Sequence, residues 1–436
     1  MPDAEIRPVT PEDDFQAQVD LGQRAFGLYS PAQKASWLYA ARLRAGQGMF
    51  LGAFAGEQPA GAALFHDMRQ WWAGRAVPCA GVASVKVAPE YRGQGIGRRL
   101  MTELLAVIAA RGYPLSALFP ATMPIYRSLG WELAGGRYDA AVPARSLRTL
   151  MPPDPAASAA SAAWDAGAAH GASPAAGGAE AGHGAAPAVR RAGPRDAAAV
   201  LGVIGRCHEA ARDCGPLTWD EPLAARWLSR DDMYAYLTGD GFAAYRWADG
   251  NQTLFVERVQ AASAESARAL WSVIASHGST VARVRARVAP NDPLWWLTHE
   301  RDAAIAKRSL WMLRVVDAPA AIAARGFPPA VTLSVPLVIE DHARPANSGH
   351  WQLSVSDGKG VLIPNGPVSS PGALPSGLEG GGSSAFRLGA RGLAALYAGT
   401  PVTTLRLAGL AAGGTPDAGA ALDAAFAATA YMLDDF

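Results

Sequence analysis

Apolar and polar residues alternate most regularly between Val82 and Phe119. The first part, VASVKV, has apolar and β-branched residues at strand spacing and stops before Pro89, which predicts a strand. Apolar residues then recur every three or four positions, as in an amphipathic helix: Ile96, Leu100, Leu104 and Ile108. After Gly112, residues 115–119 (LSALF) predict the next strand. The predicted order is strand, glycine-rich loop, helix, strand.

A similar layout occurs twice along the chain. The segments that begin at Ile6 and Val189 each read as a short strand, a proline-containing turn with acidic capping candidates, and a helix. Each copy later reaches a helix that ends in glycine, at Gly112 or Gly278, and then a strand. The similarity is one of pattern, and it predicts two copies of one mixed α/β unit.

The pattern changes after Asp317, a candidate helix N-cap before an alanine-rich helix that ends at Gly326. Strands are predicted over 331–339, 350–357 and 359–363, and helices over 390–398 and 421–433. This region predicts a third, smaller α+β unit.

The clearest boundary runs over 152–187, which consists almost entirely of Ala, Gly, Ser and Pro. So little large apolar surface cannot offset the entropy lost on ordering, so we predict a flexible linker. The predicted organisation is a catalytic domain over 1–151, this linker, a second domain over 188–316 and a third over 317–436.

Composition excludes several classes of protein. With 39 basic and 38 acidic residues, the net charge of +1 provides no global field for nucleic acid or an anionic membrane. The start of the chain lacks the features of a secretory signal, and no apolar run approaches the roughly 20 residues that span a bilayer. Only Cys79, Cys207 and Cys214 are present, which fits a reducing cytoplasm. Cys207, His208 and Cys214 lack further ligands at suitable spacing, so helix packing is favoured over a metal site.

The glycine-rich loop carries the candidate chemistry. Without Cβ atoms at Gly93, Gly95 and Gly97, successive backbone N–H groups can close around an anion, and the following helix adds its dipole. A pyrophosphate suits this site, and Arg92 and Arg98 could add bonds to its oxygens. The alternative is a simple tight turn before a helix. A Walker loop would end in Gly-Lys-Ser/Thr, which is absent, and the dinucleotide-binding fingerprint has a different glycine spacing.

This segment resembles the GCN5-related N-acetyltransferase (GNAT) superfamily, whose pyrophosphate motif is Arg/Gln-x-x-Gly-x-Gly/Ala after a strand. The resemblance implies that the backbone of the strand pairs with pantetheine, that the loop holds pyrophosphate, and that the next strand splays away to form the thioester slot. The residues then expected to bind acetyl-CoA are Val85, Lys86, Val87, Arg92, Gly93, Gln94, Gly95, Ile96, Gly97, Arg98, Ala121 and Thr122. Tyr126 stands where the superfamily places a tyrosine near the sulfur, as general acid; the alternative is a packing aromatic.

The three-unit plan resembles the Eis (enhanced intracellular survival) acetyltransferases. These join a catalytic GNAT domain, a degenerate GNAT domain and a sterol-carrier-like domain, which makes the expected fold class α/β (α+β). The clearest matching segments are SVKVAPEYRGQGIGRRLM, PIYRSLGW, VVDAPAAIAARGFP and ARGLAALYAGTPVTTLRLAGLA. The second unit has no Arg-x-x-Gly-x-Gly, consistent with a degenerate copy.

In that family the C-terminal carboxylate acts as general base, which implies this role for Phe436. The tail contains Met432, Leu433 and Phe436, so it is apolar enough for burial; the alternative is a frayed terminus. An amine must be neutral to attack a thioester, and a carboxylate can accept its proton.

The resemblance also implies broad amine acceptors, such as aminoglycosides, polyamines and lysines, and a homohexamer. Phe26, Trp37, Asp434 and Asp435 could line an acceptor pocket, and each is equally explained by packing or solvation. Ser84 is a further candidate for the acceptor pocket; some members carry a bulky aromatic there, so this chain departs from them in their aminoglycoside contacts. A lysine or peptide acetyltransferase and a lipid or sterol carrier with a vestigial GNAT fold are the alternatives.

Overall fold

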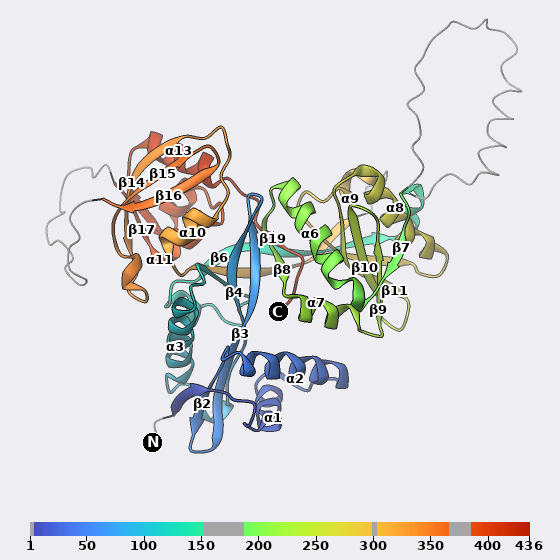
Figure 1. The fold of residues 1–436 in the computed structure, drawn as a ribbon, viewed down its shortest axis with the longest axis horizontal. Coiled ribbons are helices and arrows are strands. Elements are labelled where there is room, and N and C mark those ends of the chain that lie inside the picture. The colour runs from blue at the N-terminus through green and yellow to red at the C-terminus, as the bar shows by residue number, and fades with distance from the viewer. Residues whose placement is uncertain (1–3, 151–186, 299–302, 366–384) are drawn as a thin grey trace, which may run out of the picture. The chain divides into compact units, whose positions relative to one another are not determined.

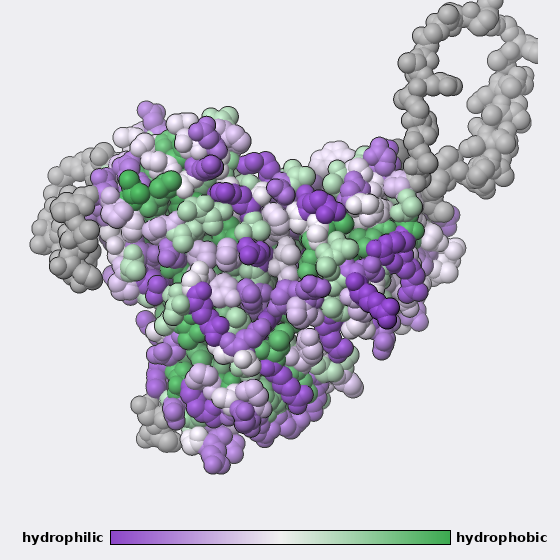
Figure 2. All heavy atoms as spheres, in the orientation of Figure 1, coloured by the Kyte–Doolittle hydropathy of each residue, from purple (hydrophilic) through white to green (hydrophobic). Residues whose placement is uncertain are grey.

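The computed structural model describes residues 4–150, 187–298, 303–365 and 385–436. The predicted linker, apart from Pro187, lies outside the described residues. The chain forms two compact units: unit 1 contains 1–138, 208–223 and 308–436, and unit 2 contains 139–207 and 224–307. Figure 2 shows hydrophilic and hydrophobic side chains interspersed on the visible surface. Within the described ranges, no helix is long and apolar enough to cross a bilayer.

Unit 1 is built on a mixed sheet with the order β1-β2-β3-β4-β5-β13, and β8 pairs with β3. Figure 1 labels β2, β3, β4 and β8 of this sheet. Its strands are β1 (Glu5–Pro8), β2 (Phe50–Ala55), β3 (Gln58–Trp72), β4 (Arg75–Val87), β5 (Leu115–Leu118) and β8 (Cys214–Trp219). Strands β6 (Glu132–Pro143) and β13 (Ala304–Val315) have residues in both units. β4 and β5 run parallel, as expected when a helix connects two strands.

Helices cover both faces of this sheet. They are α1 (Phe15–Phe26), α2 (Pro31–Gly46), α3 (Ile96–Ala110) and the short α4 (Pro124–Arg127). Side chains alternate along β3, so Phe65 is buried in the α3 cluster with Leu100, while Leu64 is buried in a cluster that holds Phe15 of α1. The predicted amphipathic helix is confirmed, because Ile96, Leu100, Leu104 and Ile108 are all buried.

The C-terminal part of unit 1 has a second sheet with the order β16-β15-β14-β17-β18. Its strands are β14 (Leu333–Glu340), β15 (Gly349–Ser356), β16 (Lys359–Pro364), β17 (Phe386–Gly389) and β18 (Ala411–Gly413). Its helices are α10 (Ala318–Ala324), α11 (Ala390–Tyr397), α12 (Val402–Leu407) and α13 (Pro416–Phe426). Asp317 caps α10 as predicted, accepting a hydrogen bond from the N–H of Ala320.

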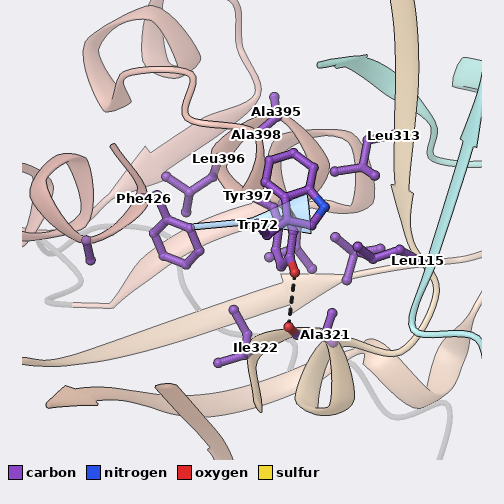
Figure 3. Close-up of a cluster of buried hydrophobic side chains, with 14 of the residues drawn as sticks. Trp72, Leu115, Leu313, Ala321, Ile322, Ala395, Leu396, Tyr397, Ala398 and Phe426 are labelled. Carbon is purple, nitrogen blue, oxygen red and sulfur yellow. Dashed lines mark hydrogen bonds between the residues drawn. The ribbon is translucent and has the colours of Figure 1, made fainter. Parts of the chain in front are cut away.

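One aromatic cluster joins the two sheets of unit 1 (Figure 3). The rings of Trp72, on β3, and Tyr397, on α11, lie 5.0 Å apart at a steep angle. The Tyr397 hydroxyl donates to the carbonyl of Ala321 in α10 over 3.1 Å. The buried Arg325 guanidinium lies 5.1 Å from the Trp72 ring, and burial lowers its pKa. This cluster fixes the second sheet and its helices to the end of β3.

The prediction of a helix through 421–433 is wrong at its end. Helix α13 stops at Phe426, and Tyr431–Met432 forms strand β19, parallel to Gly136 and Arg137 of β6. Pairing with β6 overrides the helix propensity of this segment. The segment can approach β6 because residue 135 is glycine: a Cβ there would collide with the Ala430 carbonyl. Such close approach is possible only without a side chain.

Unit 2 has strands β7 (Arg190–Ala192), β9 (Met233–Leu237), β10 (Gly241–Ala248), β11 (Thr253–Ala261) and β12 (Arg283–Val288). Its helices are α6 (Ala197–Ala211, up to residue 207), most of α7 (Glu221–Leu228), α8 (Ala264–Ala275) and α9 (Leu294–Leu297). β11 and β12 pair in parallel and are connected through α8, just as β4 and β5 pair in parallel and are connected through α3. The predicted second α/β unit therefore exists.

Candidate functional site

The slot is the place where β4 and β5 part, after Val82 and Leu118. The two strands are paired in parallel from Cys79 opposite Leu115 to Val82 opposite Leu118, and the pairing ends there. β4 continues to Val87, so its last residues have an edge that β5 does not occupy. Backbone N–H and C=O groups on such an edge can pair with an extended ligand.

A β-bulge marks the start of this unpaired stretch. β3 and β4 pair through Leu64 with Ala83 and through Ala62 with Lys86, so β4 carries one extra residue there. Within the bulge, Ser84 has a φ of +54°, a strained conformation for a non-glycine residue. Bulges re-aim side chains next to active sites.

The glycine-rich loop leads from β4 into α3. Gly93 and Gly95 have φ of +76° and +78°, and nothing lies within 4 Å of a Cβ built on either. Gly95 is the N-cap of α3 and no side chain caps the helix, so the N–H groups of its first turn face an open loop. A Cβ at Gly97 would lie only 3.2 Å from Ile125 Cδ1, so this glycine brings α3 close to α4.

Side chains around the loop are largely exposed. Arg92 donates weakly to the carbonyls of Val87 and Ala25 over 3.4 and 3.5 Å. Gln94 donates to the carbonyl of Glu90 over 3.1 Å. Arg98 is exposed on the first turn of α3, as are Ala121 and Thr122 before α4. Of the predicted cofactor residues, only those from Arg92 to Gly95 form the open loop between β4 and α3, and the others lie on β4, on the first turn of α3 or before α4.

Tyr126 lies on α4 and is buried in the cluster beneath α3. Burial raises the pKa of its hydroxyl to about 12. Among the described residues, no group hydrogen-bonds this hydroxyl. A neutral phenol without a protein partner is available to donate a proton to a ligand.

The end of the chain is packed within unit 1. The Phe436 ring lies 5.5 Å from that of Phe119, directly after β5, and 6.1 Å from that of Trp219. Its Cδ2 lies 3.1 Å from the position of a Cβ at Gly81. Phe436 therefore rests on the paired part of β4 and β5, just before the slot.

Side chains on β6 and β8 hold the residues before it. Trp219 Nε1 donates to Asp434 Oδ1 over 3.0 Å, and Arg137 forms an ion pair with Asp435. The Arg137 guanidinium lies 5.2 Å from the Phe119 ring. No hydrogen bond or ring contact joins Phe436 to Tyr126, the two predicted catalytic residues, in the described part of the chain.

The structure joins two of the predicted acceptor-pocket residues. Trp37 Nε1 donates to Ser84 Oγ over 2.9 Å. Beneath them, Lys86 Nζ lies 4.3 Å from the Trp37 ring centroid and donates to the carbonyl of Gln18 over 2.7 Å. Phe26 lies apart from these contacts at the end of α1, with its side chain 56% exposed.

Four residues beside the tail were not predicted from the sequence: Arg44, His66, Arg137 and Trp219. Arg44 Nε donates to His66 Nδ1 over 3.2 Å, and the His66 ring lies 5.8 Å from that of Trp219. A histidine on an otherwise apolar strand is one signal, but a core histidine gives the same pattern. No group of residues suited to a metal ion occurs in the described ranges.

Comparisons with known proteins give three family matches. Residues 5–134 and 215–315 each match acetyltransferase (GNAT) domain models, and residues 318–433 match a sterol carrier protein domain. The chain is 30% identical to the N-acetyltransferase Eis of Mycobacterium bovis over 329 residues, covering 72% of this chain and 73% of that protein. It is 27% identical to an uncharacterized N-acetyltransferase of Streptomyces griseus, over 65% and 67% of the two chains.

Solved structures agree with these matches. A GCN5-related N-acetyltransferase from Kribbella flavida is 41% identical, with a TM-score of 0.83 over 100% of this chain and 98% of that chain. Eis1 from Mycobacterium abscessus, at 23% identity, has a TM-score of 0.72 over 99% and 100%. The predicted fold class, tandem GNAT folds followed by a sterol-carrier-like domain, is confirmed.

Proposed function

We propose a function from the premise that the chain belongs to the Eis family of GNAT N-acetyltransferases. It is an N-acetyltransferase, and GNAT enzymes use acetyl-CoA as co-substrate. The proposed reaction is direct transfer of the acetyl group to amines of broad range, such as those of aminoglycosides or polyamines. The observation that carries the proposal is the slot between β4 and β5, which opens beside an uncapped helix N-terminus.

We assign the co-substrate to this slot and loop. Backbone groups of Val85 and Val87 would pair with the pantetheine amides as an added strand. The N–H groups after Gly93 and Gly95 would surround the pyrophosphate, with Arg92 and Arg98 near enough to add charge. The open space around both glycines supports this assignment.

The α-carboxylate of Phe436 is the proposed general base. It would take a proton from the acceptor ammonium, directly or through water, so that the neutral amine can attack the thioester carbon. The packing of the Phe436 ring against Phe119 and Trp219 supports a fixed position for this carboxylate.

Tyr126 is the proposed general acid. Attack by the amine breaks the bond between the acetyl carbon and sulfur, and the Tyr126 hydroxyl donates its proton to the departing thiolate. Because burial raises its pKa to about 12, the hydroxyl stays protonated throughout the physiological range. Its lack of a partner among the described residues supports this role.

The proposal is tested by CoA release from acetyl-CoA with aminoglycosides, small polyamines and lysine peptides as acceptors. The native chain is compared with one extended by a few residues after Phe436, which displaces the carboxylate but leaves the loop intact. We expect the native chain to turn over amines and the extended chain to bind acetyl-CoA with little turnover. Turnover of lysine peptides alone would favour a protein acetyltransferase, and absence of acetyl-CoA binding would favour the carrier function.

The Tyr126→Phe variant tests the proposed role of Tyr126 as general acid. Its ring keeps the packing under α3 and only the hydroxyl is lost, so we expect an unchanged melting temperature. Removing a general acid typically lowers kcat by about 10²–10⁴-fold. Wild-type kcat in this variant would show that Tyr126 only packs.

A further inference from the structure

We propose that His66 is a positioning residue for the general base: its Nε2–H donates a hydrogen bond, directly or through one water molecule, to the α-carboxylate of Phe436. This inference rests on the proposed function and adds to it a residue that neither the sequence patterns nor the comparisons assign. It is carried by the sheet register, two ring contacts and the hydrogen bond at Nδ1.

The register places His66 on the same face of the sheet as the chain end. His66 of β3 is directly opposite Gly81 of β4, which is beside Ala117 of β5. Residues opposite each other project to the same face, with Cβ positions about 5 Å apart. Gly81 has no side chain. The Met68 thioether occupies the place of its Cβ, and the Phe436 ring lies beside it, with Cδ2 3.1 Å from that position. The Phe436 ring therefore lies over the row of the sheet that contains His66.

Trp219 contacts both the His66 ring and the Phe436 ring. Its ring meets the His66 ring edge-on at 5.8 Å and the Phe436 ring edge-on at 6.1 Å. Its indole N–H also fixes Asp434 of the tail. Trp219 thus links the imidazole to the short stretch that carries the terminal carboxylate.

The contact at Nδ1 fixes the tautomer. The Arg44 guanidinium is always protonated, so its Nε–H must donate, and Nδ1 of His66 must accept with a lone pair. The proton of the neutral ring then sits on Nε2. Arg44 is itself held by Gln47 Oε1 over 2.7 Å and Asp220 Oδ2 over 2.6 Å. This network orients the ring, as outer-shell partners orient functional histidines.

The donor at Nε2 has no partner in the described part of the chain, yet the ring is only 8% exposed. Nε2 is not among the fully buried polar atoms without a partner, so this nitrogen borders accessible space, where a carboxylate oxygen or a water molecule can accept its N–H. Burial and the Arg44 charge lower the pKa of His66 to about 3, so the ring stays neutral and donates from Nε2 alone.

Other charges near the tail have partners of their own. Asp435 pairs with Arg137, and Asp434 accepts from Trp219. On the far side of the imidazole stand Arg44 and Asp220, which bind each other. The terminal carboxylate is therefore the acceptor that matches the His66 donor.

Two matched substitutions distinguish the roles of the two imidazole nitrogens of His66. His66→Gln places an amide N–H near the position of Nε2, and His66→Asn places an amide oxygen near Nδ1, where it can still accept from Arg44. We expect His66→Gln to keep kcat/KM within about threefold of wild type, whereas His66→Asn should lose about tenfold or more. If His66→Asn instead kept the wild-type kcat/KM and His66→Gln lost it, His66 would serve only to anchor Arg44.

A second measurement does not depend on turnover. With ¹³C at the phenylalanine C1 position, only the terminal carboxylate titrates, because the other phenylalanine carbonyls are amides. Loss of a donor disfavours the charged form, so its titration midpoint should rise in His66→Asn by roughly half a unit to one unit and stay near wild type in His66→Gln. The same titration midpoint in the wild type and in both variants would overturn the inference. Failure of the wild type to acetylate any amine would refute only the proposed function.

Discussion

At the residue scale, the backbone and the side chain of Lys86 have different surroundings. Its backbone belongs to the stretch of β4 proposed to pair with pantetheine, while its amine lies buried over Trp37 on the opposite side. Burial lowers the pKa of Lys86 to about 7. The sequence suggested only the backbone role, because burial of a lysine amine depends on the helices that cover it.

This burial predicts a pH-dependent stability effect. Between about pH 7 and 10.5 the unfolded chain binds more protons than the folded one, so the penalty for burying Lys86 is complete below pH 7 and fades as pH rises to 10.5. The Lys86→Met variant lacks this group, so it should exceed wild type in stability by about 1 kcal/mol or more at pH 7. That advantage should shrink by pH 10.

Urea unfolding of both proteins between pH 6 and 10 measures the difference. Lys359→Met, at an exposed lysine of β16, is the control for removing an ammonium group. An advantage of Lys86→Met that stays constant with pH would contradict the prediction.

At the element scale, the two ends of α3 have the same backbone conformation and different tasks. Gly95 at the start has a φ of +78°, and Gly112 after the end has a φ of +77°, both with open space where a Cβ would stand. Glycine avoids the strain of this conformation at each end. Only the start faces the proposed pyrophosphate position.

Gly95→Ala and Gly112→Ala should therefore destabilise the protein equally, by about 1 kcal/mol. Gly95→Ala alone should weaken acetyl-CoA binding, by about tenfold, because the added methyl group and the shifted N–H groups disturb the anion site. Thermal unfolding and isothermal titration with acetyl-CoA measure the two effects. Equal loss of acetyl-CoA affinity in both variants would show that only helix stability matters.

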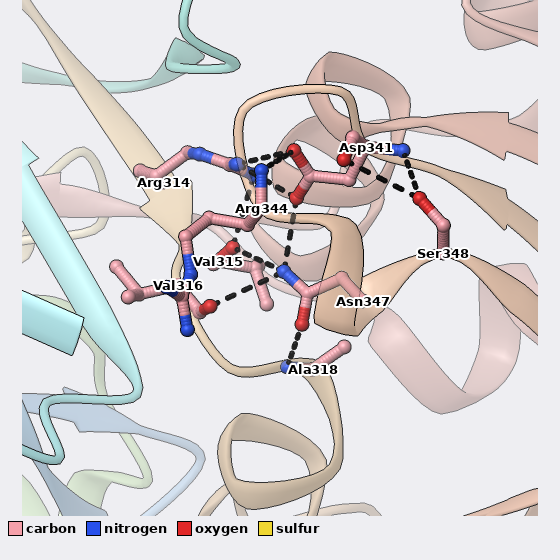
Figure 4. Close-up of polar contacts among 8 residues, drawn as sticks. All are labelled: Arg314, Val315, Val316, Ala318, Asp341, Arg344, Asn347 and Ser348. Atoms are coloured by element: carbon pink, nitrogen blue, oxygen red, sulfur yellow. Dashed lines mark hydrogen bonds and ion pairs between the residues drawn. The ribbon is translucent and has the colours of Figure 1, made fainter. Parts of the chain in front are cut away.

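At the scale of the whole molecule, a buried ion pair links β13 to the end of β14 in unit 1 (Figure 4). Arg314 and Asp341 are fully buried, and Arg314 Nη2 donates to both carboxylate oxygens over 2.6 Å. Asn347 donates to the same carboxylate over 2.9 Å and accepts from the N–H of Ala318. The network orders the segment where the chain passes from one sheet of unit 1 to the other.

Removing one partner leaves a buried, uncompensated charge. Arg314→Met should therefore cost about 3–5 kcal/mol in the free energy of unfolding, whereas the double variant Arg314→Met, Asp341→Leu should recover much of it. Arg24→Met breaks the exposed pairs with Asp20 and Glu90 and serves as control, with an expected effect below about 1 kcal/mol. Guanidinium titration of the three variants tests this, and a double variant no more stable than Arg314→Met would contradict it. The expected homohexamer stays a prediction, which sedimentation equilibrium can check.

The site was predictable where it depends on local sequence. The glycines at 93, 95 and 97 and the helix after them were evident because turn chemistry and apolar spacing act within a few residues. Arg44, His66 and Trp219 could not be assigned, because they come from α2, β3 and β8, and only the folded sheet brings them together.

The sequence by itself determined the strand, loop and helix of the proposed cofactor site and the order of three α/β segments, since these follow from periodicity and motif spacing. Only the tertiary structure decided where β4 and β5 part, that the chain after α13 forms a strand along β6, and that His66 and Phe436 both contact Trp219. These features depend on pairing between segments far apart in the chain, whose free energy no local pattern encodes.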